Sequence, residues 1–286
     1  MNQNWTMDVN FRHDRLKKNH PEVFKMKRLI FQVAVGTPNK LYELCIKSVA
    51  EYCKKYQIEH IVLREPKLRI RPDINRTGRS KQAVSRLGYL PIYEKENAFE
   101  YLRTHDQVCI VDSDIYIKAI APNIFDLLPF DCSFGGVIER QMPLTKKYFN
   151  KIRKYSRNAF KNLTDVNWKW NTNGAEFFNM GLMLMNKNIL WYLKNETPKQ
   201  FLSRPEFKDF VDGVGFYKWS TDQMLLNWWV KTEKMTVKHL DWKWNALYTA
   251  VEDNKLKEAY FVHFFLKDLL PNKGEEIESL LKKING

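Results

Sequence analysis

Two aspartates, Asp112 and Asp114, interrupt the otherwise apolar stretch "VCIVDSDIYI". Residues i and i+2 of an extended chain point to the same face, so these two carboxylates should lie together. Like charges at that separation repel each other, and burial would raise the pKa of both carboxyl groups. A divalent cation with oxygen ligands would remove the repulsion. With Ser113 between them, the pair indicates a metal site, although an Asp-x-Asp pattern alone is common on protein surfaces.

The elements before this stretch must place the pair at a sheet edge. Residues 28–36 are typical of a strand, residues 38–56 show apolar positions at helical spacing, and residues 58–65 are typical of a second strand. A strand, a helix and a strand joined by short links form a βαβ unit, which predicts a parallel sheet. Ligands of open α/β sheets bind beyond the carboxyl ends of the strands. The pair lies near such an end.

The rest of the chain continues the α/β pattern without a linker. We expect a helix over 81–102, a central strand over 107–117, a strand near 134–139 and a strand that enters a helix at 177–190. A helix over 220–231, capped by Ser220 or Thr221, and an amphipathic helix over 275–283 follow. This predicts an N-terminal extension over 1–27 and a single α/β domain over 28–286 with a basic insertion around 140–170.

The net charge of +14 is concentrated in two segments. Residues 64–86 have a net charge of +6 and residues 140–170 have +8, which together account for the whole excess. Localised basic segments indicate a polyanionic partner, whereas their alternative interpretation is a solvated surface.

Cysteine usage and hydropathy limit the class of protein. The 4 cysteines include no CxxC pair, so we expect buried free thiols rather than a zinc site or disulfides. No apolar run approaches the roughly 18 residues of a transmembrane helix, and the polar N-terminus lacks an apolar signal-peptide core. We therefore expect no transmembrane segment and a cytoplasmic protein, with peripheral contact at the inner membrane surface if its acceptor lies there.

Five short blocks, in this order, resemble the retaining GT-A glycosyltransferases that include glycogenin and bacterial lipopolysaccharide galactosyltransferases (glycosyltransferase family 8). The blocks are AVSRLGYL, VCIVDSDIYI, FFNMGLMLMN, TDQMLLN and LDWKWNAL, and they fall within about residues 29–270. Each block is weak alone, and the ordered set is much stronger. The resemblance implies a GT-A fold, which is an α/β fold with a mixed, mostly parallel sheet flanked by helices.

The resemblance also implies a set of site residues. Mn2+, or Mg2+, would be bound by Asp112, Asp114 and His263. The nucleotide-sugar donor, most simply a UDP-sugar, would contact Arg86, Asp112, Ser113, Asp114, Gly181 and Lys267. Thr37 and Asn39 are further donor-binding candidates, because their side chains could hydrogen-bond the base. Asn179, Asp222 and Gln223 would face the donor sugar as catalytic candidates. The "VHFFLKDLLP" segment lacks the family's glycine between His263 and Lys267, and the "AVGTPNK" loop lacks its acidic residue.

The resemblance implies that these residues carry out metal-dependent sugar transfer with retention. The cation acts as a Lewis acid on the leaving diphosphate, and Arg86 and Lys267 supply fixed positive charge. Among the 9 tryptophans, helical spacing assigns three to the core, namely Trp191, Trp228 and Trp229. Four others flank the expected sugar site and are acceptor candidates, namely Trp168, Trp170, Trp242 and Trp244.

Three functions remain open on sequence alone. The first is sugar transfer to an anionic envelope glycan or glycolipid at a membrane surface. The second is sugar transfer to modified bases of viral DNA, since residues 140–170 mix aromatic and basic side chains as single-strand binders do. The third is a catalytically silent nucleic-acid-binding protein with the same fold, against which the complete set of site residues argues.

Overall fold

The computed structural model describes residues 26–36, 39–79 and 88–285. Two of the expected donor-binding residues, Thr37 and Arg86, lie outside the described residues. The main sheet has the strand order β2-β1-β3-β6-β5-β7, and a smaller sheet has the order β4-β9-β8. The strands of the main sheet are β1 (Arg28–Val33), β2 (Glu59–Leu63), β3 (Gln107–Val111), β5 (Phe134–Ile138), β6 (Phe178–Asn186) and β7 (Val237–His239). The small sheet contains β4 (Ile115–Ile117), β8 (Ala246–Leu247) and β9 (Phe261–His263).

The main sheet is mixed and mostly parallel. β1 is parallel to β2 and β3, β5 is parallel to β7, and β6 runs antiparallel to both of its neighbours. Every residue of β3, β5 and β6 is buried, as strands covered on both faces require. An α/β fold with such a sheet confirms the predicted fold class.

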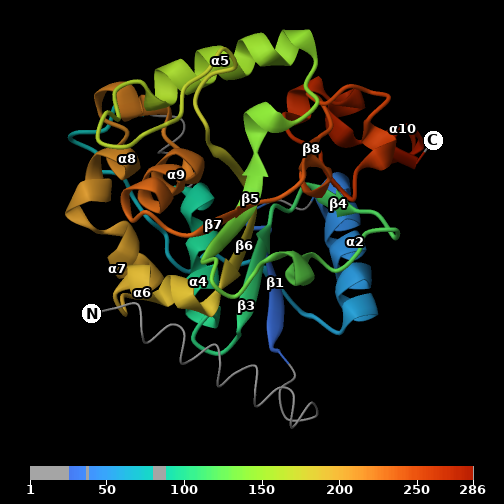
Figure 1. Ribbon diagram of the computed structural model, residues 1–286, viewed down its shortest axis with the longest axis horizontal. Coiled ribbons are helices and arrows are strands. Elements are labelled where there is room, and N and C mark those ends of the chain that lie inside the picture. The colour runs from blue at the N-terminus through green and yellow to red at the C-terminus, as the bar shows by residue number, and fades with distance from the viewer. Residues whose placement is uncertain (1–25, 37–38, 80–87, 286) are drawn as a thin grey trace.

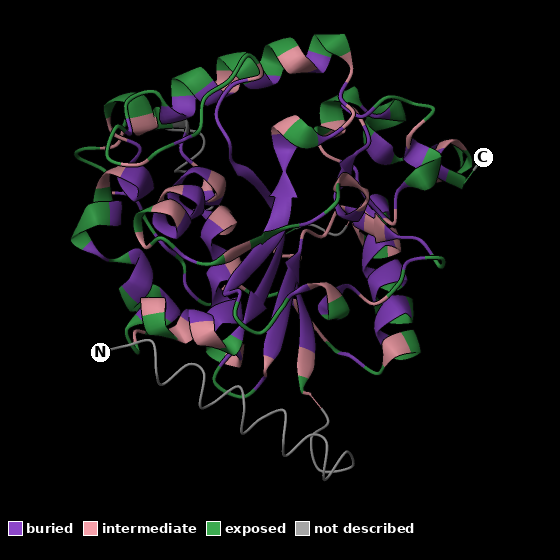
Figure 2. Cartoon of the chain, in the orientation of Figure 1, coloured by how far each residue is buried: buried purple, intermediate pink, exposed green. Residues whose placement is uncertain are grey.

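Helices flank this sheet on both sides (Figure 1). They are α2 (Lys40–Tyr56), α4 (Ala98–Tyr101), α5 (Lys146–Phe160), α6 (Leu190–Leu193), α7 (Pro198–Leu202), α8 (Lys208–Asp212), α9 (Asp222–Thr232) and α10 (Ile277–Asn285). α2 lies on one side, α4 and α6 to α9 lie on the other, and α5 crosses the end of the sheet. The strands form the buried centre, while α5 exposes its outer face (Figure 2).

The structure corrects two of the predicted elements. The stretch 107–117 is not one strand, because β3 ends at Val111 and β4 begins at Ile115 in the other sheet. The described part of the predicted helix 81–102 is a 3-10 helix, η1 (Pro91–Asn97), followed by the short α4. Pro91 at the start of η1 contributes no backbone N–H to the preceding turn, which favours a new element there.

Side-chain burial confirms some of the core predictions and corrects others. All four cysteines are buried free thiols. Trp229 is buried, but Trp191 is 68% exposed, because α6 is only one turn long and turns this residue outward. Within the described residues, no helix has both the length and the apolar character needed to cross a bilayer.

Candidate functional site

The break between β3 and β4 creates the centre of the site. Asp112 follows β3 directly, its backbone N–H donates to the Gly181 carbonyl at 2.8 Å, and Asp114 precedes β4. β4 pairs with β9 so that Ile115 lies opposite His263, the last residue of β9. The His263 ring is thereby held beside both aspartates. One ligand atom from each of the three residues lies within 4.8 Å of the others, a group that could hold a metal ion.

The donor set and its geometry fit a divalent cation. His263 Nε2 lies 3.1 Å from Asp114 Oδ1 and 3.8 Å from Asp112 Oδ2. Adjacent ligands of an octahedral Mg2+ site with bonds near 2.1 Å lie about 3 Å apart, so the observed separations suit one ion. The other ring nitrogen, Nδ1, is 3.1 Å from Asn245 Oδ1. If Nδ1 donates in this bond, the lone pair of Nε2 faces the carboxylates, as metal-binding histidines require.

Gly181 allows this close approach. It lies in β6, next to the His263 ring. A Cβ at this position would overlap the ring carbon Cε1 and would lie 2.7 Å from Nδ1. Residue 181 must therefore be glycine for His263 to occupy its position.

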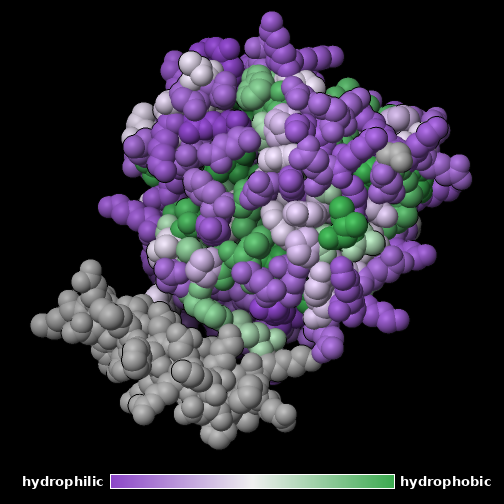
Figure 3. Space-filling model, turned by 45° about the vertical axis from the view of Figure 1, so that its right-hand side comes forward, coloured by the Kyte–Doolittle hydropathy of each residue, from purple (hydrophilic) through white to green (hydrophobic). Residues whose placement is uncertain are grey.

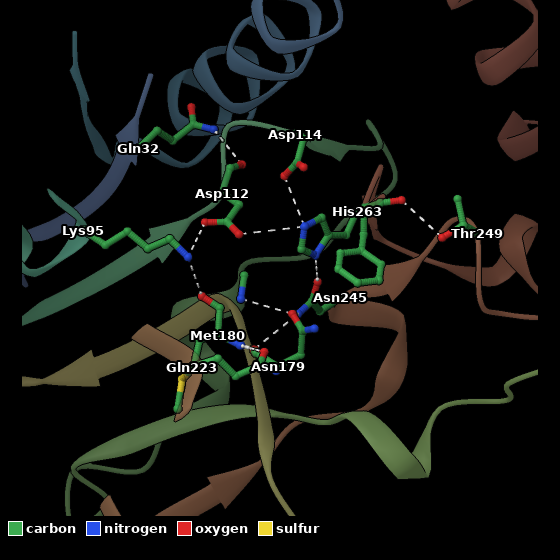
Figure 4. A network of polar contacts seen from close by, with 12 residues as sticks. Gln32, Lys95, Asp112, Asp114, Asn179, Met180, Gln223, Asn245, Thr249 and His263 are labelled. Carbon is green, nitrogen blue, oxygen red and sulfur yellow. Dashed lines mark hydrogen bonds and ion pairs between the residues drawn. The ribbon is translucent and has the colours of Figure 1, made fainter. Parts of the chain in front are cut away.

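Lys95 lies at the centre of the site, and sequence analysis did not identify it. Its Nζ is 2.7 Å from Asp112 Oδ1 and donates to the Met180 carbonyl at 3.2 Å (Figure 4). The same Nζ is 2.9 Å from Asp222 Oδ2. η1 carries Lys95 into the site, and Asp222 is the first residue of α9. The ammonium group of Lys95 therefore bridges Asp112, one of the expected metal ligands, and Asp222, which is expected to face the donor sugar.

The charges of the site shift one another's pKa values. Burial raises the pKa of Asp112 to about 6, against the opposing effect of Lys95. Burial also acts to raise the pKa of Asp114, but the His263 imidazole outweighs it and holds the pKa below its usual range. For His263 and Lys95, burial alone would lower the pKa, but the neighbouring carboxylates outweigh burial and raise both values. The neighbouring charges therefore favour the ionised form of Asp114, whereas burial disfavours the ionised form of Asp112.

A chain of hydrogen bonds extends from His263 through amide side chains to a buried carboxyl group. Asn245 Nδ2 donates to Asn179 Oδ1 at 2.9 Å, and Asn179 Nδ2 donates to Glu139 Oε2 at 2.9 Å. The Tyr148 hydroxyl donates to Glu139 Oε1 at 2.9 Å. Burial raises the pKa of Glu139, while the bonds from Asn179 and Tyr148 oppose the rise. The amide of Asn179 is thus engaged within the protein.

The site contains one cavity of about 420 Å³, which His263, Lys95 and Glu139 line together with the residues named next. Of the predicted residues, its walls include Asp112, Asp114, Asn179, Gly181, Asp222, Gln223 and His263. Gln223 accepts from Met180 N at 3.1 Å and donates to the Tyr155 hydroxyl at 3.3 Å. The second basic segment also reaches the cavity, because Tyr148, Lys151, Ile152 and Tyr155 of α5 line it.

Three other predicted residues lie outside the walls of this cavity. Asn39 caps α2, where its side chain accepts from Leu41 N at 2.8 Å. Lys267 follows Leu266, which does line the cavity, and Ser113 is half-buried between the two aspartates.

The proposed aromatic acceptor surface is corrected in part. Trp168 is buried and donates through Nε1 to the Leu163 carbonyl, and Trp244 is buried as well. Trp242 is half-buried, so Trp170, at 45% exposure, is the most accessible of the four candidates. Tyr148 and Phe160 of α5 are also buried. The aromatic residues of 140–170 therefore pack largely inward and do not form a broad stacking surface.

Comparison with known proteins supports the fold. No protein-family model matches the chain, and no curated protein matches its sequence. The galactosyltransferase LgtC, in complex with donor and acceptor sugar analogues, matches with a TM-score of 0.52 and 14% identity over 90% of this chain and 95% of LgtC. An active-site mutant of LgtC matches with a TM-score of 0.51 and 14% identity over 89% of this chain and 94% of its own.

A glycosyltransferase involved in glycosylation of the major capsid of PBCV-1 also matches, with a TM-score of 0.44, at 13% identity over 89% of this chain and 99% of its own. The chain has the GT-A fold, as the likeness to LgtC and the mixed sheet show.

Proposed function

We propose that this protein is a metal-dependent glycosyltransferase. In this proposal it moves a sugar, with retention, from a nucleoside diphosphate sugar, most simply a UDP-sugar, to an anionic acceptor. The observation that carries the proposal is the Asp112–Asp114–His263 cluster at the carboxyl end of β3 in a GT-A fold. This is the edge at which open α/β sheets bind ligands.

The residues of the cavity have distinct roles in this proposal. Asp112, Asp114 and His263 would hold Mn2+ or Mg2+, which supplies Lewis acidity to the leaving diphosphate when bound. Lys95 contributes a fixed positive charge beside them, and Arg86 and Lys267 remain proposed donor contacts. Asp222 and Gln223 begin α9 at the cavity wall and would orient the sugar. We assign Asn179 a positioning role, since its amide links Asn245 to Glu139.

The outer face of α5 is the proposed site of acceptor binding. Seven basic residues lie on or just after the helix, and none forms an ion pair with a described residue: Lys146, Lys147, Lys151, Arg153, Lys154, Arg157 and Lys161. Hydrophilic side chains project along the top edge of Figure 3, where α5 lies. Because one edge of the helix lines the cavity, an anion held on this face would lie beside the donor. The inward packing of the aromatic residues favours an envelope glycan or glycolipid over DNA.

Donor binding tests the central part of the proposal. In calorimetry, UDP should bind in the presence of Mn2+ and should lose most of its affinity in EDTA. Asp114→Asn should lose the Mn2+ dependence, whereas Asp131→Asn, at an exposed carboxylate that forms no ion pair with a described residue, should keep it. Equal affinity for UDP with and without Mn2+ would show that the cluster is not a donor metal site.

Acceptor binding is tested separately, with anionic liposomes, single-stranded DNA and duplex DNA across a salt series. Binding through α5 should weaken steeply as salt rises. It should be lost when Lys147, Lys154 and Arg157 are changed to serine. Liposome binding supports the glycolipid acceptor, and preferential DNA binding would favour the DNA-modifying alternative. If neither liposomes nor DNA bind at low salt, the acceptor is not anionic and a neutral acceptor is the remaining explanation.

A further inference from the structure

A second cavity, of about 590 Å³, lies apart from the candidate site and shares no lining residue with it. One wall is the segment 67–71, and the other is formed by residues 199–212. Six basic residues line it, together with a single acid, Asp212: Lys67, Arg69, Arg71, Lys199, Arg204 and Lys208. Its volume falls within the range of about 300–1,000 Å³ that is typical of small-molecule sites.

Only two of these six cations are neutralised by neighbouring carboxylates. Arg204 is 2.8 Å from Glu196, and Lys208 is 3.0 Å from Asp212. The other four cations form no ion pair with a described residue: Lys67, Arg69, Arg71 and Lys199. The cavity therefore gathers four uncompensated positive charges from two segments far apart in the chain.

The loop that carries three of these cations is held by a buried carboxylate. Lys67 N, Leu68 N and Arg69 N donate to Glu94 at 2.8, 3.0 and 2.7 Å. Glu94 has no exposed surface, and Asn97 also donates to it at 2.9 Å. Three successive N–H groups around one anion form a rigid nest. The loop geometry is thus fixed from inside the protein.

The same loop holds an unfavourable backbone conformation. Arg69 has a φ of 48°, in the left-handed region that a residue with a long side chain rarely adopts. Such strain, about 1–3 kcal/mol, persists only where the surrounding structure over-determines it, and it concentrates at ligand clamps. Leu68 and Ile70 are buried, while Lys67, Arg69 and Arg71 are exposed. The fixed loop therefore presents three cations toward the cavity.

We propose that this cavity binds a ligand with closely spaced phosphate groups, at a site separate from the donor cavity. Four cations in one small cavity, unpaired with any described carboxylate, favour a ligand with dense negative charge, and a phosphate group carries up to two charges. Arg69 and Arg71 can form bidentate bonds to phosphate oxygens, and the two lysines act as point charges. The ligand is either a soluble oligophosphate or a phosphorylated lipid headgroup.

The test measures the binding of inorganic tripolyphosphate to the full chain by calorimetry, at low ionic strength and in EDTA. EDTA removes any cation-bridged binding at Asp112 and Asp114. The wild-type protein should bind tripolyphosphate. The variant with Lys67, Arg71 and Lys199 changed to serine should bind at least about tenfold more weakly, since a single hydrogen bond to a charged group is worth about that factor. These side chains are exposed and unpaired with described carboxylates, so the variant should fold normally.

A matched control removes the same charge elsewhere. Lys47 and Lys54 of α2, on the opposite side of the sheet from α7 and α8 (Figure 1), and Lys187 are exposed and form no ion pair with a described residue. Changing these three to serine should leave affinity within about twofold, because screened surface charges contribute little. No wild-type binding, unchanged affinity in the cavity variant, or equal loss in both variants would overturn the proposal.

The two sources of phosphate are separated by a vesicle arm. Vesicles containing phosphatidylinositol bisphosphate should sediment with the wild-type protein, but not with the cavity variant, if the ligand is a headgroup. If only tripolyphosphate binds, the ligand is soluble, and either result supports a phosphate site. The experiment measures phosphate binding in EDTA and needs no sugar transfer. A failure of the glycosyltransferase proposal would therefore not change its result.

Discussion

Gly181→Ala perturbs the candidate metal site at one defined contact. The added Cβ would overlap His263 Cε1 and lie 2.7 Å from Nδ1, whereas ordinary contact begins near 3.4 Å, so the ring must move by about 0.7 Å or more. The ring has little freedom, because β9 is paired with β4 and Nδ1 is 3.1 Å from Asn245 Oδ1. The substitution therefore either displaces the ring or strains β6.

The expected magnitudes follow from these contacts. Overpacking a close-packed core costs about 1–3 kcal/mol, and weakening the His263–Asn245 hydrogen bond adds about 0.5–1.5 kcal/mol. We expect the free energy of unfolding to fall by about 2–4 kcal/mol. Metal sites tolerate ligand displacements of only about 0.2 Å, so Mn2+ affinity should fall about 10–100-fold, the range seen when the support of a ligand is lost.

Urea unfolding measures the first quantity, and Mn2+ titration followed by electron paramagnetic resonance measures the second. Gly135→Ala is the control, because Gly135 is a buried glycine in the same sheet whose Cβ would meet the flexible Leu128 Cδ1 at 3.1 Å. We expect it to leave Mn2+ affinity unchanged. If Gly181→Ala binds Mn2+ as tightly as the wild type, His263 is not a ligand and the geometric argument is refuted.

Three further perturbations test other parts of the site. Lys95→Met leaves the carboxylates of Asp112 and Asp222 buried without their cation, so it should lower the free energy of unfolding in EDTA by about 3–5 kcal/mol, and Mn2+ should restore part of this loss. An unchanged urea midpoint in EDTA would contradict the bridging role. Asp222→Asn and Gln223→Ala should reduce the rate of sugar transfer while leaving UDP affinity in calorimetry nearly intact; loss of UDP affinity in both would mean that they contact the nucleotide. Glu96 is fully buried without a hydrogen-bond partner among the described residues, and burial raises its pKa well above 4.5. The folded state therefore keeps this proton to a higher pH than the unfolded chain does, so the contribution of Glu96 to the free energy of unfolding falls as pH rises above about 4.5. In urea unfolding between pH 5 and 8, Glu96→Met should remove up to about 1.4 kcal/mol per pH unit of that fall.

Local sequence patterns predicted the helices and strands better than they predicted which charged side chains would be buried in the site. Helical spacing in 38–56 and the buried run in 177–190 follow from neighbouring residues, and α2 and β6 formed there. Lys95 lies in the run "YEKEN", which has the composition of a solvated surface, and only the tertiary fold turns it toward Asp112. Glu139 likewise follows a strand end, where an exposed carboxylate is common, yet it is buried against Tyr148.

The basic segments show the same limit. The positive charge of both segments follows directly from the sequence. Where that charge lies in the fold depends on the elements against which each segment packs. The second segment became α5 and lines the candidate site, as the gathering of loops at the ligand edge predicts. The described part of the first segment instead packs against α8, where Arg76 is 2.8 Å from Asp209. Clustered charge in the sequence therefore does not predict which cavity the charged side chains will line.

The pair of aspartates that interrupts an apolar run is explained by a change of sheet. A single strand through 107–117 would have kept both carboxylates in the core with no space for a counter-charge. Ending β3 at Val111 and starting β4 at Ile115 opens the backbone at Asp112 and Asp114. The small sheet then delivers His263 on one side, and η1 delivers Lys95 on the other. His263 and Lys95 come from segments distant in sequence, and the apolar residues after Asp114 pair with β9 instead of extending β3.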